Sequence, residues 1–71
     1  MIYEFSYRSD NASLNESAGG NPPELPAVGG IKTFNQPGMR GCFRVQRVQD
    51  PVHLSGKTTY VIELARLKAM N

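Results

Sequence analysis

Polar and apolar residues alternate strictly at the start of the chain, which predicts a half-buried β-strand over residues 2–8. Tyr3, Phe5 and Tyr7 share one face of this strand, and polar residues occupy most of the other. We expect the three rings to belong to the core, because a chain of 71 residues has few large apolar side chains to place elsewhere. The alternative is a platform on which unpaired bases stack.

A longer apolar pattern in the second half of the chain predicts a β-hairpin. Its strands, residues 42–49 and 58–64, are rich in β-branched and aromatic residues and are bounded by turn-forming residues. We pair Val45 with Ile62, because this register gathers the apolar side chains of both strands on one face. It also sets Phe43 opposite Leu64, Arg47 opposite Tyr60, and Arg44 opposite Glu63.

This register has two consequences. Arg44 and Arg47 point to opposite faces of the hairpin, and residues 50–57 form its loop. An alternative register makes the Ser-Gly pair at 55–56 a tight turn and pairs residues 52–54 as well, with the preceding proline at an edge or a bulge. We prefer the first register, and the sequence leaves both open.

Residues 9–30 interrupt the apolar pattern and are dominated by Ser, Asn, Gly, Pro and Ala. We expect a connection without secondary structure here, a flexible arm within the single domain of residues 1–71. Leu25 and Val28 are isolated apolar residues in this arm, and we predict that they anchor it when it orders against a neighbouring subunit or a partner.

The remaining segments complete a mainly β fold. Residues 31–35 suit a short strand, and Gln36-Pro37-Gly38 suits a turn. Residues 65–70 fit either a fraying strand or one helical turn. These elements predict a small antiparallel sheet or an open barrel of SH3-like or OB-like kind.

The size of the chain limits what its core can contribute. A domain this short buries only about 60% of the surface that its unfolded chain exposes. Cys42 is the only cysteine, so no internal disulfide supplements the core. Oligomerisation or docking to a partner is therefore the expected support.

Charge divides the chain into an acidic and a basic half. Residues 1–31 hold one Arg against four Asp and Glu, whereas residues 32–71 hold seven Lys and Arg against two Asp and Glu. A basic half favours an anionic partner. The predicted partner-binding residues lie on or beside the hairpin: Arg40, Arg44, Arg47, Lys57, Arg66 and Lys68.

No motif in the sequence supports catalysis, and we expect no enzyme activity, cofactor or metal. The string at 56–58 resembles the end of a phosphate-binding loop, but a proline stands where that loop needs glycine and a strand follows. Cys42 and the single histidine, His53, lie at opposite ends of the predicted hairpin, so they form no catalytic pair. Cys42 is expected to be a small apolar filler.

Three functions are consistent with these observations. The first, which we favour, is an adaptor or inhibitor-type module that binds an acidic protein partner through the basic hairpin. The second is a nucleic-acid-binding β-domain with Tyr3, Phe5 or Tyr7 stacking on bases. The third is a homo-oligomer or a structural subunit of a larger assembly, such as a viral particle. The sequence shows no spanning apolar run and no signal peptide, so we expect a cytoplasmic protein without membrane contact.

Overall fold

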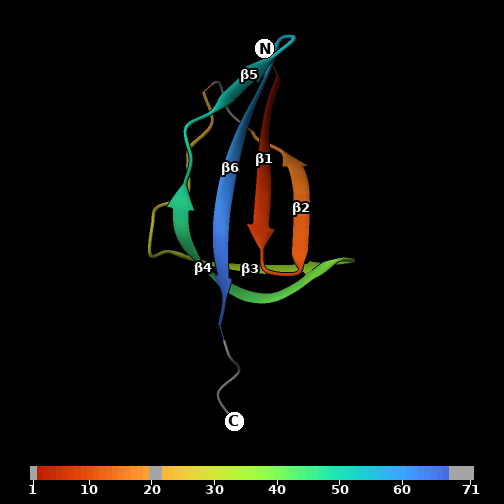
Figure 1. Cartoon of the computed structure of the whole chain (residues 1–71), viewed down its shortest axis with the longest axis vertical. Coiled ribbons are helices and arrows are strands. Elements are labelled where there is room, and N and C mark those ends of the chain that lie inside the picture. The colour runs from red at the N-terminus through yellow and green to blue at the C-terminus, as the bar shows by residue number, and fades with distance from the viewer. Residues whose placement is uncertain (1, 20–21, 68–71) are drawn as a thin grey trace.

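The computed structural model describes residues 2–19 and 22–67, and these residues form six strands and no helix (Figure 1). The strands are β1 (Ile2–Ser9), β2 (Ala12–Ser17), β3 (Ile31–Gln36), β4 (Met39–Val48), β5 (Val52–Leu54) and β6 (Lys57–Arg66). The predicted fold class, a small mainly β domain with an open sheet, is confirmed.

The strands make one sheet in the order β2-β1-β6-β4-β3, with β5 also paired to β6. Four of the strand pairs are antiparallel, whereas β1 and β6 run parallel. The sheet is therefore mixed rather than purely antiparallel. The sheet curls, and β3 runs across the direction of β1 and β6 (Figure 1). The molecule is therefore an open half-barrel with a concave and an outer side.

The core lies on the concave side. Tyr7 on β1 touches Phe34 on β3 with ring centroids 4.9 Å apart, although two strands separate β1 from β3 in the sheet. Phe34 in turn packs on Phe43 at 5.7 Å. The buried apolar set is Phe5, Tyr7, Phe34, Met39, Phe43, Val45, Ile62 and Leu64.

The predicted core role of the first strand is confirmed for two of its three rings. Phe5 and Tyr7 are buried. Tyr3 is half-buried and stacks on Tyr60 with ring centroids 6.4 Å apart. Only Tyr3 and Tyr60 thus keep ring surface toward solvent, and base stacking by Tyr3 stays a prediction.

The preferred hairpin register is wrong by two residues. Val45 lies opposite Leu64 rather than Ile62, and Phe43 lies opposite Arg66. The alternative turn is the one observed, because Ser55 and Gly56 both have positive φ, 48° and 79°, and close β5 onto β6. As far as Val45, this even shift leaves each side chain of β4 on its predicted face, so the inward positions of Phe43 and Val45 are confirmed.

The expectation of no secondary structure in residues 9–30 is wrong for β2. This strand folds back on β1 across a two-residue turn, with Ser9 opposite Ala12. Ala12, Leu14 and Glu16 are half-buried, while the residues between them are exposed. The alternation typical of a strand is present in this part of the sequence, but the contrast between its two faces is weak because many of its residues are small or polar.

Part of the remaining connection is bonded to the sheet. The Gly29 amide donates to the Val45 carbonyl at 2.8 Å, and the Val45 amide donates to the Gly30 carbonyl at 2.9 Å. Pro23 is buried. The predicted anchors Leu25 and Val28 are 43% and 67% exposed, so ordering of this segment against a partner stays a prediction.

The shorter predicted elements are confirmed. β3 contains the strand predicted at 31–35, and the turn after it has Gly38 with a φ of 88°. β6 ends at Arg66, one residue beyond the predicted end of the strand. The alternative helical turn over 65–70 falls mainly on residues outside those the structure describes.

The edge strands β2 and β3 each turn a charged side chain toward the concave side. Glu16 on β2 shares the core face with Phe5, its partner on β1. Lys32 on β3 places Nζ 5.4 Å from the centroid of the Tyr7 ring. Burial raises the pKa of Tyr7, and the Glu16 carboxylate, which accepts a hydrogen bond from the phenol, raises it further.

We expect replacement of Ser55 by Asn to stabilise the fold by about 0.5–1 kcal/mol, because Asn tolerates the positive φ that this turn requires. Urea unfolding followed by circular dichroism measures the change. Gly56→Ala is the matched control in the same turn and should destabilise the protein. Equal stability of all three proteins would contradict the assigned turn.

We expect alkaline pH to destabilise the protein through Tyr7. In the unfolded chain a tyrosine loses its proton near pH 10, whereas folding raises the pKa of Tyr7. Stability from this group is complete below about pH 10 and is lost as the pH rises further. Urea midpoints between about pH 8 and 11 should fall less steeply for Tyr7→Phe than for the wild type. Tyr3→Phe is the control, and a slope unchanged in Tyr7→Phe would refute this assignment.

Candidate binding surface on the outer face of the sheet

A β-bulge in β4 places Arg44 and Arg47 on the same face of the sheet. The register between β4 and β6 shifts between Val45 and Arg47, so that Arg44 lies opposite Ala65 and Arg47 lies opposite Glu63. Residues two apart on β6 share a face, so both arginines point outward. The prediction that they point to opposite faces is therefore wrong, because Gln46 is an extra residue that reverses the alternation.

Two more arginines extend this surface. Arg8 on β1 lies beside Glu63 in the parallel pair, and Arg40 precedes Arg44 by four residues on β4. All four side chains are exposed, on the side of the sheet opposite the core. We call this set the arginine face; it consists of Arg8, Arg40, Arg44 and Arg47.

Glu63 is the carboxylate at the middle of the arginine face. Its Oε2 accepts a hydrogen bond from Gln49 Nε2 at 2.6 Å and lies 3.8 Å from Arg47 Nε. The Arg47 side chain is 70% exposed and that of Glu63 is 39% exposed, so this ion pair contributes little stability and leaves Arg47 accessible. The predicted pairing of Glu63 with Arg44 is wrong, because the observed register sets Glu63 opposite Arg47.

The other arginines are also available for binding. Arg40 Nη1 donates to Asn35 Oδ1 at 3.0 Å, which orients the guanidinium without burying it. Arg8 Nε lies 3.4 Å from Ser6 Oγ. Within the described part of the chain, the Arg44 side chain makes no hydrogen bond or ion pair.

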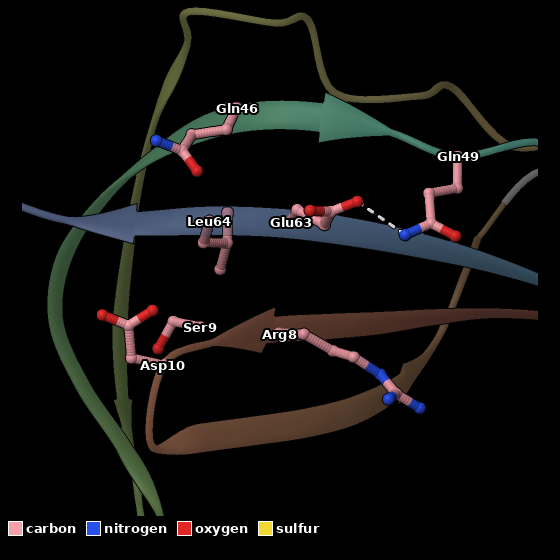
Figure 2. A pocket seen from close by; sticks show the side chains of 7 residues that line it. All are labelled: Arg8, Ser9, Asp10, Gln46, Gln49, Glu63 and Leu64. Atoms are coloured by element: carbon pink, nitrogen blue, oxygen red, sulfur yellow. Dashed lines mark hydrogen bonds between the residues drawn. The ribbon is translucent and has the colours of Figure 1, made fainter.

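A shallow depression of about 320 Å³ borders this surface, with Arg8 and Glu63 in its lining. Figure 2 shows its lining side chains coming from β1, β4 and β6, from the turn after β1 and from the segment after β4. The lining is mainly polar: Arg8, Ser9, Asp10, Gln46, Gln49, Glu63 and Leu64. Small-molecule pockets of this volume are mostly apolar, so the depression is better suited to a protruding polar side chain of a macromolecule.

The remaining predicted binding residues lie elsewhere. Lys57 is at the far end of β6, and its Nζ lies 3.3 Å from Glu4 Oε1. Arg66 lies on the concave side, 4.6 Å from the Phe43 ring centroid, and donates to the Arg40 carbonyl at 2.6 Å. Lys68 lies outside the described residues. The structure thus brings together three of the six, Arg40, Arg44 and Arg47.

Sequence reasoning missed Arg8 and Ile31 as members of this surface. Ile31 lies opposite Arg44 and is 57% exposed. Arg8 was predicted to point away from the core, but its position beside Glu63 depends on the parallel pairing of β1 with β6. No local pattern in the sequence indicates that pairing.

The two residues considered as a catalytic pair, Cys42 and His53, lie far apart. Cys42 is exposed, with Sγ 3.5 Å from Thr33 Oγ1, so its predicted role as an apolar filler is wrong. His53 Nδ1 is 2.8 Å from Thr58 Oγ1, at the opposite end of β6 from Cys42. In residues 2–19 and 22–67, no three His, Cys, Asp or Glu side chains gather closely enough to hold a metal ion.

Comparison with protein-family models, curated proteins and solved structures gives no match to this chain. Over the described ranges, no helix has the length and apolar character needed to span a membrane.

We expect deletion of Gln46 to leave the protein folded, with a loss of about 1 kcal/mol, because Arg47 then follows Val45 in regular alternation and keeps its partner Glu63. Deletion of Cys42 is the control. It removes a residue from a regular part of β4 and turns buried side chains outward, so this variant should unfold. Thermal unfolding of both variants measures the difference, and equal losses would contradict the bulge.

Proposed function

We propose that this protein is a small non-enzymatic binding module whose arginine face engages an acidic surface of a protein partner. The observation that carries the proposal is the bulge-dependent alignment of Arg44 and Arg47 with Arg8 and Arg40 on one exposed face. Glu63 is the carboxylate that lies among these four cations, so the face keeps a positive charge.

The chemistry of arginine favours this role. The guanidinium group is planar, is always charged in proteins and donates two parallel hydrogen bonds to a carboxylate. Arginine is also enriched among the residues that dominate the binding energy of protein interfaces. Exposed arginines on a rigid sheet lose less conformational freedom on binding than arginines on a loop, and a positive face steers acidic partners toward it.

Three observations favour a protein over a nucleic acid as the partner. The rings of Phe5 and Tyr7 are buried on the concave side, so they offer no stacking surface. Ile31 exposes apolar surface beside Arg44, a combination typical of protein interfaces. In a nucleic-acid complex, the phosphate backbone would lie against the Glu63 carboxylate and be repelled by it. A protein partner carries separate carboxylates, which fit between the arginines on either side of Glu63.

A nucleic-acid-binding function is the second candidate, because the aligned arginines would also release counterions from phosphates. The assembly-subunit function, viral or otherwise, is less favoured. It relies on an unpaired edge strand, and the edge strands β2 and β3 each carry a charged side chain that turns inward, a device that discourages edge-to-edge pairing.

The test is binding of a fluorescently labelled acidic peptide, rich in Glu and Leu, measured by anisotropy. We expect Arg44→Ala combined with Arg47→Ala to weaken binding by roughly 10–100-fold, because each change removes a central contact of the interface. The matched control is Lys57→Ala combined with Arg66→Ala, which removes the same charge outside the arginine face and should leave the affinity nearly unchanged.

Labelled single- and double-stranded oligonucleotides are titrated in parallel at low and near-physiological salt. Oligonucleotide binding that is tighter than peptide binding and weakens steeply with salt would replace the proposal by the nucleic-acid function. Equal weakening in both double variants would show that net charge alone governs binding, and would overturn the assignment of the arginine face.

A further inference from the structure

The other end of the outer face exposes apolar rather than basic side chains. Ile2 is 64% exposed, Val52 49% and Leu54 70%. Ile2 on β1 and Leu54 on β5 both lie beside Lys57 on β6, from its two sides. We call Ile2, Val52 and Leu54 the apolar corner.

The three residues form one patch rather than scattered exposures. Val52 and Leu54 are two apart on β5 and share a face, and the pairing with β6 puts that face on the outer side of the sheet. Figure 1 shows β5 and the start of β1 at the same end of the molecule, on either side of β6. Contiguous apolar surface of this kind marks an interaction site.

The charges at the apolar corner are balanced, unlike those of the arginine face. Lys57 Nζ and Glu4 Oε1 lie 3.3 Å apart, and their side chains are 47% and 25% exposed. This is one cation and one anion on the same patch. A two-fold interface requires a patch that is complementary to itself, and such a pair meets its own opposite charges after a two-fold rotation.

We propose that the apolar corner is an interface with a second copy of this chain. The two-fold rotation brings the apolar side chains of the two copies together and lets Lys57 of each copy reach Glu4 of the other. The arginine face is excluded as a self-interface, because four arginines around Glu63 repel a second copy.

Homodimerisation through the corner also compensates for the small core, since the buried patch adds apolar area that the single chain cannot bury. The corner and the arginine face lie at opposite ends of the outer face, so both are usable at once. A dimer then presents two arginine faces, which increases the avidity for a partner with repeated acidic sites.

The interface is small, so the dimer is weak. Three apolar side chains and one ion pair are far fewer than the 20–30 residues on each side of a standard interface, which places the dissociation constant on the order of 10–100 μM. The measurement is sedimentation velocity of the full chain from about 5 to about 500 μM. We expect the mass to rise with concentration from the 7.8 kDa of the monomer toward twice that value.

Leu54→Glu should keep the protein monomeric over the whole range. Ser13→Glu is the control, because it adds the same negative charge at an exposed residue of β2 outside the corner, and it should dimerise like the wild type. Ile2→Glu repeats the test from another strand and decides the outcome where Leu54→Glu does not fold.

Three results would overturn the proposal: a wild type that stays monomeric at the highest concentration, a Ser13→Glu variant as impaired as Leu54→Glu, or a dimer that persists in both corner variants. The dimer is also expected to survive Arg44→Ala combined with Arg47→Ala, which weakens the acidic-peptide complex. Failure of this inference is thereby distinguishable from failure of the proposed function.

Discussion

The fold depends on one constraint: a single sheet without a second layer can bury its apolar side only by curling. The contact between Tyr7 on β1 and Phe34 on β3 closes this curl across two intervening strands. Edge-to-face rings supply much buried area from few residues, which suits a core that contains eight buried apolar side chains among residues 2–19 and 22–67. Because all of these side chains point inward, the outer face is not part of the apolar core, and its side chains are available for recognition.

Position along β6 determines the character of each part of the outer face. Near the end of β6, its neighbours are Arg8 and Arg47, and near its beginning they are Ile2 and Leu54. The strand is ten residues long and contacts β1, β4 and β5 along its length. It therefore separates a basic surface from a charge-balanced apolar one by the distance from Lys57 to Glu63 along β6, roughly 20 Å, so the two proposed interfaces do not overlap.

The sequence was sufficient to predict the faces of β4 residues before the bulge, and insufficient to predict register. Alternation identified the inward positions of Phe43 and Val45, and an error of two residues preserved them. The bulge at Gln46 has no local signature. The register of β5 against β6, which the turn at Ser55 and Gly56 closes, differs by two residues from that of Val45 against Leu64. The bulge accounts for one of these two residues, and the break between β4 and β5 accounts for the other.

The parallel pair and β2 were missed for other reasons. Parallel pairing joins residues that are more than fifty positions apart, and nothing in either strand alone distinguishes it from antiparallel pairing. β2 contains Ser, Asn and Glu, which have low strand propensity, and it forms because β1 offers a long apolar partner across a tight turn. For the same reasons the candidate surface could not be predicted in full. Arg8 belongs to it because β1 and β6 pair in parallel, and Arg47 belongs to it because of the bulge.

The edges of the sheet explain why recognition should use the outer face. The main sheet order ends in the edge strands β2 and β3, and such edges recruit other strands unless something prevents it. Glu16 and Lys32 turn charge toward the core beside these edges, so that a strand added there would cover and desolvate them. Lys32 Nζ lies over the ring of Tyr7, and Glu16 accepts a hydrogen bond from the Tyr7 phenol, so both charged groups are held beside their edges. These charges disfavour strand addition at β2 and β3, which supports the proposal that association uses side chains on the outer face.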